Sequence, residues 1–312
     1  MMRLRIVWGL IFQLAFLATW GQSANALLYS TPVADTLRVM PVDTWLWEIT
    51  HPDFRDTSYL YAILPELPGD QFEIPAEVYR FARNQEKLVL AIDPRNPPLD
   101  NLHRVEVPLD STLEELLVPA DYLSLKAWVK DSLSSLSYYK FQMRYPPSVL
   151  ERQFMKDYCL SEQDQPPTAM VEYTLLQELK LPLLKIGTDW TRIAWLDVYS
   201  YQAQTWHLWN TYQERAIKCE IYQAMLRAYF QQDLDRVWLL AQSAPDLGYK
   251  VGGLLEARNE AWVKTLALHL PMERLLIAVN AAQLAGEYGM IHQLRKQGYR
   301  FKPIYLSPNV QP

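Results

Sequence analysis

The sequence predicts a mixed α/β (α+β) fold, in which a central mixed sheet is built from two related halves and a large helical section occupies the middle of the chain. Two observations predict it. Short apolar runs rich in β-branched and aromatic residues occur towards both ends of the chain, whereas the pattern across residues 111–244 is predominantly helical. Each half is expected to contribute a strand, a loop, helices and a further strand.

A β-hairpin and a buried strand are expected in the first half. Residues 45–49 and 58–64 are rich in aromatic and β-branched residues, and residues 51–53 (HPD) between them favour a turn. Residues 87–93 (KLVLAID) form a continuous apolar run, which is typical of a buried strand. The first half therefore supplies at least three strands to the predicted sheet.

Helix start signals follow each of these segments. Pro75 precedes a helical pattern over residues 76–84, and proline is favoured at the first helical position. Residues 111–114 (STLE) have the spacing of a capping box and start a helical section that runs to about residue 180. Breaks in this section are expected at residue 119, at residues 146–147 and at the polar stretch 161–167 (SEQDQPP).

The second half repeats the order of strand, helices and strand. Residues 181–187 (LPLLKIG) predict a short apolar strand, residues 192–244 predict aromatic-rich helices, and residues 253–270 predict a further helix. The apolar run 275–279 is followed by a glycine-containing loop, a helix that ends at Gly298 and a final strand. In α/β folds, such strand-to-loop junctions are where ligands usually bind.

The N-terminal residues predict export. Arg3 and Arg5 form a basic region, residues 6–18 form an apolar region, and residues 24–26 (ANA) supply the small residues that a signal peptidase requires. The apolar region is shorter than the roughly 20 residues of a membrane span. A retained N-terminal anchor is the competing interpretation. We expect an exported protein, periplasmic or secreted, without a stable membrane span.

These boundaries define the expected organisation of the chain. Residues 43–306 are expected to form one domain, and the polar stretch 161–167 separates its two halves. The predicted segments are a signal peptide (1–26), a linker (27–42), an N-terminal half (about 43–160), a C-terminal half (about 168–306) and a tail (307–312).

The charge of the chain argues against a nucleic-acid partner, and its glycines argue against a phosphate-binding loop. Without Arg3 and Arg5, the 30 basic residues fall to 28 against 35 acidic ones, a net charge of −7. A nucleic-acid surface would need clustered basic residues, so no nucleic-acid partner is expected. The chain has only 10 glycines, and none forms a GxGxxG or GxxxxGK phosphate-binding loop.

The residues that usually carry catalysis or bind metals show no known pattern. The sequence contains no GxSxG or HExxH, and none of its five histidines lies three or four residues from another. Cys159 and Cys219 have no zinc-site spacing. In an oxidising compartment they are either a disulfide or two buried thiols.

Four segments together resemble the TraB/GumN family, which is related to the Tiki-type metalloproteases. They occur in the family's order and extend over residues 44–304, nearly the whole predicted mature chain. The segments are the hairpin LWEIT…DTSYLYAILPELP, the strand LVLAID, the helix LLEARNEAWVKTL and the C-terminal stretch IAVNAAQLAGEYGMIHQLRKQGY.

The resemblance implies a metal site that this sequence does not retain. Family members carry a Gly-x-x-His after the hairpin, a glutamate at the end of the third strand and a second Gly-x-x-His before the last helix. Two histidines and a carboxylate can converge on a metal ion. This chain differs at all five positions, which we call the family-site positions: Ala62, Pro65, Ala91, Asn280 and Gln283.

Four further residues are candidates for a cleft. Glu66 and Asp93 are the only acidic residues near these loops, and they either bind Ca²⁺ or Mg²⁺ weakly or are solvated loop carboxylates. Arg258 and Asn259 match an Arg-Asn pair of the family. The arginine either braces neighbouring loops or holds an anionic ligand such as a peptide carboxylate.

Two functions are consistent with these observations. The first is an exported, catalytically inactive TraB/GumN-like protein that binds a peptide, glycan or protein partner, with no cofactor. The alternative is a metal-dependent hydrolase or protease of the Tiki-like type, with a rearranged site that uses Glu66, Asp93 and Arg258. Metal-assisted hydrolysis needs several good ligands and an open coordination position, so the sequence favours binding.

Overall fold

The fold is seen in a computed structural model that describes residues 44–64, 66–68, 73–95, 107–160, 168–187, 199–243 and 254–306. The predicted signal peptide, linker and tail lie outside these ranges, as does Pro65. Within these ranges, no helix combines the length and the apolar character that crossing a membrane requires.

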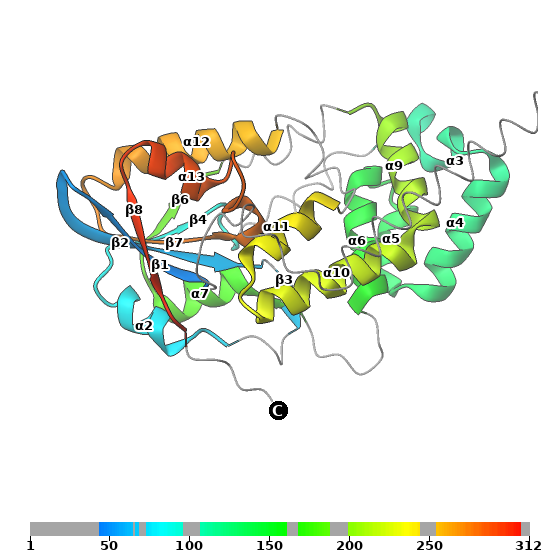
Figure 1. Ribbon diagram of the computed structural model, residues 1–312. Coiled ribbons are helices and arrows are strands. Elements are labelled where there is room, and N and C mark those ends of the chain that lie inside the picture. The colour runs from blue at the N-terminus through cyan, green and yellow to red at the C-terminus, as the bar shows by residue number, and fades with distance from the viewer. Residues whose placement is uncertain are drawn as a thin grey trace, which may run out of the picture. The chain divides into compact units, whose positions relative to one another are not determined.

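A six-stranded mixed sheet contains strands from both halves of the chain, as predicted (Figure 1). Its strand order is β6-β4-β7-β2-β1-β8. The strands β6, β4, β7 and β2 run parallel to one another, whereas β1 is antiparallel to both β2 and β8. The strands are β1 (Leu46–His51), β2 (Phe54–Ile63), β4 (Lys87–Leu90), β6 (Leu183–Lys185), β7 (Leu275–Asn280) and β8 (Arg300–Ile304). A separate two-stranded sheet pairs β3 (Glu66–Pro68) with β5 (Thr168–Met170).

The buried strands follow from the apolar runs of the sequence. Residues 275–279 of β7 are all buried, as expected for a strand with parallel neighbours on both sides. The predicted hairpin is confirmed. His51 pairs with Phe54, and the two residues between them form the turn. The strand predicted over residues 87–93 ends early, at Leu90. It ends because Asp93 accepts the backbone N–H of Arg95 at 3.0 Å and so turns the chain.

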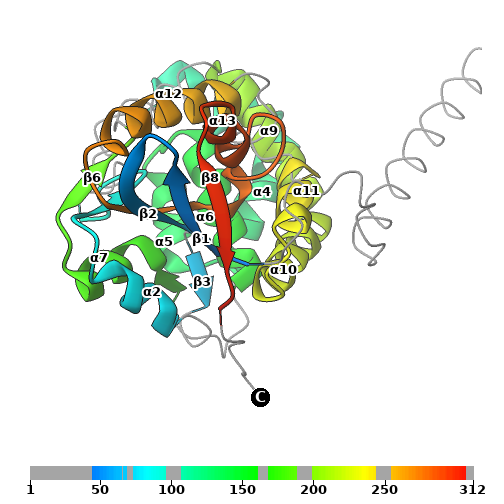
Figure 2. The same ribbon diagram turned by 60° about the vertical axis from the view of Figure 1, so that its left-hand side comes forward.

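Helices cover both faces of this sheet (Figures 1 and 2). On one face lie α2 (Ala76–Ala82) and α7 (Val171–Leu179), and on the other lie α12 (Leu254–His269) and α13 (Met290–Lys296). The helix predicted over residues 253–270 is therefore confirmed. Pro75 is the N-cap of α2 and not its first helical residue, because its ψ of 142° is extended.

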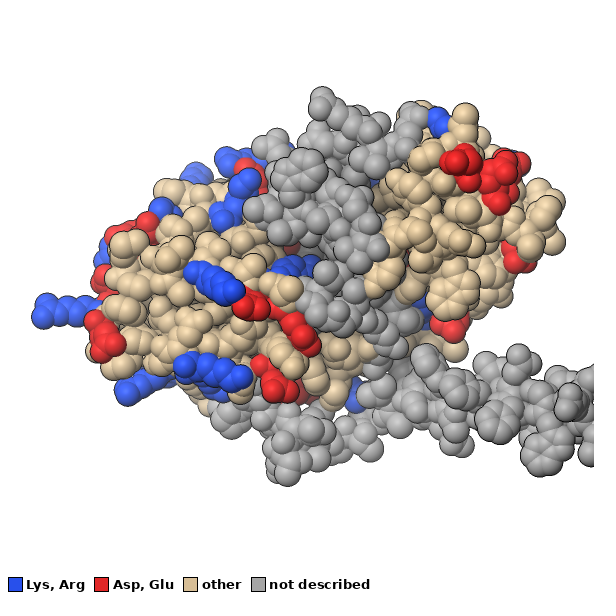
Figure 3. Space-filling view, turned by 90° about the horizontal axis from the view of Figure 1, so that it is seen from above, with Lys and Arg blue, Asp and Glu red and all other residues tan. Residues whose placement is uncertain are grey.

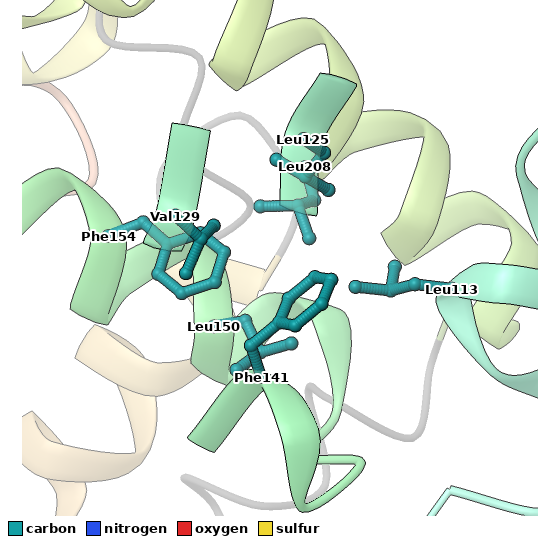
Figure 4. Close-up of a cluster of buried hydrophobic side chains, with 7 residues drawn as sticks. All are labelled: Leu113, Leu125, Val129, Phe141, Leu150, Phe154 and Leu208. Carbon is teal, nitrogen blue, oxygen red and sulfur yellow. The ribbon is translucent and has the colours of Figure 1, made fainter. Parts of the chain in front are cut away.

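A second hydrophobic core holds the helical section together. Buried side chains from five helices (α3, α4, α5, α6 and α9) meet in one cluster, drawn in Figure 4. They are Leu113, Leu125, Val129, Phe141, Leu150, Phe154 and Leu208. The helices of this section are α3 (Leu113–Leu116), α4 (Pro119–Ser132), α5 (Ser135–Gln142), α6 (Pro147–Leu160), α9 (Tyr201–Gln213), α10 (Arg215–Phe230) and α11 (Leu234–Ser243). The breaks predicted at residue 119 and at residues 146–147 are thus helix starts.

The helix start predicted from the capping-box spacing at residues 111–114 lies one residue further on. Thr112 is the N-cap of α3, and its hydroxyl accepts the backbone N–H of Glu115 at 3.4 Å. Ser111 cannot take this role because it ends a short 3₁₀ turn, Leu109–Ser111, and is not extended.

Charged side chains of both signs are scattered over the face drawn in Figure 3. Across the part of this face that the structure describes, most of the surface is uncharged; Lys and Arg are more frequent on the left of the view and Asp and Glu on the right.

Candidate functional site

Four of the five family-site positions come together at one edge of the sheet. β2, β4 and β7 run parallel, so their carboxyl ends meet there. Ala62 is the penultimate residue of β2, Ala91 directly follows β4, and Asn280 ends β7. Ile63 pairs with Asn280 in register. Gln283 lies in the short 3₁₀ helix η4 (Ala281–Gln283) that follows β7. We call this region the carboxyl edge, and α/β sheets commonly bind ligands at this position.

The loop after β7 is organised by its own side chains and by one glycine. The Asn280 side chain caps η4, because its Oδ1 accepts the backbone N–H of Ala282 at 3.0 Å. Gly286 has a φ of +82°, and a Cβ there would lie 2.8 Å from the Trp238 indole of α11. Only glycine combines this conformation with so close an approach.

Asn259 of α12 holds this loop in place. Its side chain is 1% exposed, and its Nδ2 donates to the carbonyl oxygens of Gln283 at 3.2 Å and Tyr288 at 3.0 Å. One amide group therefore fixes the two ends of the turn between η4 and α13. Asn259, the neighbour of Arg258, thus braces this loop.

Arg258 lies next to a tryptophan that the sequence analysis missed. Its guanidinium carbon is 5.8 Å from the ring centroid of Trp262, one helical turn further along α12. Trp262 is buried, and its Nε1 would lie 3.3 Å from a Cβ placed on Gly187. The same Cβ would lie 2.5 Å from the carbonyl oxygen of Ala91, so the Trp262 indole reaches the ends of β4 and β6. The spacing of four residues between Arg258 and Trp262 was the signal available in the sequence.

A tyrosine from the helical section covers the first family-site position. The hydroxyl of Tyr229, on α10, donates to the carbonyl oxygen of Ala62 at 3.2 Å. Tyr229 also stacks on Trp45, with ring centroids 4.7 Å apart, and Trp45 Nε1 donates to the Tyr229 carbonyl at 2.7 Å. Burial raises the pKa of Tyr229 and also that of Tyr61, which is hydrogen-bonded to it. Both phenols are therefore neutral hydrogen-bonding groups at neutral pH.

The two acidic candidates, Asp93 and Glu66, lie in different surroundings. Arg95 donates to both carboxylate oxygens of Asp93, from Nε at 2.9 Å and from the terminal nitrogen at 2.8 Å. These hydrogen bonds lower the pKa of Asp93. Glu66 pairs through its backbone with Met170 in the two-stranded sheet. Asp93 is thus an ionised carboxylate that already has a partner.

The histidines and cysteines lie in other surroundings. His207 Nδ1 is 3.0 Å from a carboxylate oxygen of the buried Glu151, in the helical section. Cys159 lies on α6 and Cys219 on α10, both as thiols. Within the described ranges, His, Cys, Asp and Glu nowhere form a group of three or more that could hold a metal ion.

The comparison with known protein families matches the TraB/PrgY/gumN family over residues 45–303. The chain belongs to this family. The match extends from the residue before β1 to residue 303 in β8, so it includes the carboxyl edge and all of the central sheet except the last residue of β8. No curated protein and no solved structure matches the chain.

In this TraB/PrgY/gumN protein, the side chains described at the carboxyl edge do not fit the metal that the family resemblance implies. Ala62 and Ala91 have no side-chain donor atom. The Asn280 oxygen already accepts a backbone hydrogen bond, and the Asp93 carboxylate is engaged by Arg95. A neutral amide at Gln283 is a weak ligand for the divalent metals that histidine pairs bind.

Three buried polar atoms at this edge have no hydrogen-bond partner among the described residues: Gln283 Oε1, Asn259 Oδ1 and Trp262 Nε1. All three side chains are at least nine-tenths buried. An unsatisfied buried polar group costs about 1–3 kcal/mol, so such groups are seldom left without a partner. Near the carboxyl edge, one buried donor and two buried acceptors are thus unsatisfied among the described residues.

Proposed function

We propose that this chain is an exported, catalytically inactive member of its family that binds a peptide-type partner at the carboxyl edge. The observation that carries this proposal is the set of unsatisfied polar atoms on Gln283, Asn259 and Trp262. They lie where the family's ligand positions are replaced by alanines and amides. Binding without chemistry needs a few fixed polar groups in a buried place, and this edge supplies them.

A peptide has the matching chemistry. Each peptide group presents one N–H and one C=O, so two peptide groups can donate to the Gln283 and Asn259 oxygens, and one of their carbonyls can accept from the Trp262 indole. A C-terminal carboxylate would also suit the neighbouring Arg258, because guanidinium–carboxylate pairs are strong and directional. A glycan or a loop of a protein partner offers part of this pattern through its hydroxyl or amide groups.

Retention of ligands by the purified protein tests this proposal. The immobilised mature chain is incubated with a pool of short synthetic peptides, and the retained peptides are identified by mass spectrometry. We expect wild type to enrich a subset of peptides and Gln283→Met, which removes the acceptor at similar volume, to lose it. Gln297→Met is the matched control, because Gln297 is exposed at the end of α13. Equal retention by all three proteins would refute binding at this edge.

Two further measurements test the remaining parts of the proposal. N-terminal sequencing of the protein expressed from the full-length chain is expected to give Leu27 as the first residue. Retention of Met1 in a membrane fraction would contradict export. Tightly held, stoichiometric Mn, Co or Zn in the purified protein would favour the metal-dependent hydrolase instead.

A further inference from the structure

The fold brings the two cysteines together although they are 60 residues apart in the sequence (219 − 159). Cys159 lies in the last turn of α6, and Cys219 lies in the first half of α10. Two side-chain contacts join these helices. Gln223, one turn after Cys219, donates from Nε2 to the carbonyl oxygen of Cys159 at 3.1 Å, and Lys218 Nζ lies 3.8 Å from a carboxylate oxygen of Glu151.

The two thiols are themselves in hydrogen-bonding contact. Cys159 is 7% exposed, whereas Cys219 is half-buried. The hydrogen bond to Cys219 and burial both raise the pKa of Cys159, so Cys159 retains its proton more strongly than an ordinary thiol. Cys219 is accordingly the thiol that an external reagent reaches first, and Cys159 is positioned to react with it next.

We propose that Cys159 and Cys219 form a disulfide that joins α6 to α10 when the protein meets a disulfide-bearing oxidant. The Cys219 thiolate attacks one sulfur of the oxidant's disulfide, forms a mixed disulfide and releases one thiolate. Cys159 then loses its proton and attacks Cys219 Sγ, and the second thiolate of the oxidant leaves. Two electrons and two protons pass from the protein thiols to the oxidant, which becomes a pair of thiols.

The crosslink would stabilise the helices that cover the carboxyl edge. α10 carries Tyr229, whose hydroxyl binds the Ala62 carbonyl, and α11, which follows it, packs against η4. Joining α10 to α6 restricts the unfolded chain by closing a loop of 60 residues (219 − 159). Because it depends only on α6 and α10, this inference does not rest on the proposed peptide binding.

Oxidation of the purified full chain by oxidised glutathione tests the proposal. We expect an intact mass lower by two hydrogen atoms, and a proteolytic fragment in which the peptides containing Cys159 and Cys219 are linked. The melting temperature of the oxidised protein should exceed that of the reduced protein by roughly 5–10 °C.

Serine variants serve as matched controls. Oxidised glutathione should leave the melting temperature of the double variant Cys159→Ser and Cys219→Ser unchanged. The single variant Cys159→Ser should stop at a mixed disulfide on Cys219, because the second thiol is missing. Two titratable thiols in oxidised wild type after denaturation, a lasting glutathione adduct on wild type, or a disulfide-linked dimer would each overturn the proposal. Peptide mapping of wild type distinguishes these outcomes from the expected crosslink even if a variant fails to fold.

Discussion

Replacing Asn259 by aspartate tests whether this amide holds the loop after β7. The substitution keeps the shape of the side chain but replaces the Nδ2 donor by an oxygen. That oxygen would face the carbonyl oxygens of Gln283 and Tyr288, at 3.2 and 3.0 Å, in a place where the side chain is 1% exposed. Two hydrogen bonds are lost and a buried charge is left unpaired, so we expect the free energy of unfolding to fall by about 3–5 kcal/mol at neutral pH.

The pH dependence of this loss of stability separates the effect of the buried charge from that of the lost hydrogen bonds. Burial without donors raises the folded-state pKa of the new carboxyl group above its unfolded value of about 3.9. Below that unfolded value the group is protonated in both states, is neutral, and can donate to one carbonyl. As the pH rises above it, the variant loses stability relative to wild type, and the difference becomes constant above the folded-state pKa.

Urea unfolding followed by tryptophan fluorescence measures this difference at several pH values. Asn259→Leu is the control, because it loses the same hydrogen bonds without adding a charge, and its deficit relative to wild type should stay constant with pH. An aspartate variant that is as stable as wild type would refute the reasoning. A deficit that does not vary with pH would show that the lost hydrogen bonds, and not the buried charge, account for the effect.

Three further perturbations have definite expected outcomes. A hydrogen bond of 2.7 Å from Lys87 lowers the pKa of Glu273, so Glu273→Gln should lower the free energy of unfolding by about 0.5–1 kcal/mol at neutral pH. This effect should vanish as the pH falls below 4.5, the ordinary pKa of a glutamate, and through the lower folded-state pKa of Glu273, because the stabilisation requires the ionised carboxylate. Arg258→Ala should lower the free energy of unfolding by about 1–2 kcal/mol through the lost contact with Trp262, and an unchanged melting curve with lost peptide retention would assign Arg258 to binding. Restoring the family's residues should create a protein that Mn²⁺, Co²⁺ or Zn²⁺ stabilises, by about 2.7 kcal/mol when the metal concentration is 100 times the dissociation constant. The five substitutions are Ala62→Gly, Pro65→His, Ala91→Glu, Asn280→Gly and Gln283→His.

Local patterns predicted most of the sheet. β7 was predictable because a strand with parallel neighbours on both sides must be apolar along its length, and residues 275–279 are. The hairpin was predictable because its aromatic strands flank a turn. Helix ends were less certain: Ser111 and Thr112 are both good N-caps, and the choice depends on the 3₁₀ turn before them.

The carboxyl edge was predictable only in part. The strand ends placed Ala62, Ala91 and Asn280 near one another, because parallel strands end at a common edge. The contact between Tyr229 and Ala62 spans 167 residues, and no local periodicity indicates which helical aromatic side chain reaches which strand. Trp262 escaped notice because an indole on a helix is more often part of an ordinary core.

The conformation at the two family glycine positions decides how the restored metal site should behave. Ala62 lies within regular strand, paired with Val279, and Asn280 has a φ of −57°, so neither position needs the freedom of glycine. Glycine at each should therefore cost roughly 0.5–1 kcal/mol, and the Asn280 change also removes the cap of η4. The restored protein should melt below wild type without metal and recover only when a divalent ion binds. A matched control with the two glycines alone should melt lower and show no response to metal. If the fully restored protein folds but no metal raises its melting temperature, the strand ends at this edge have moved from the geometry that the family's ligands require.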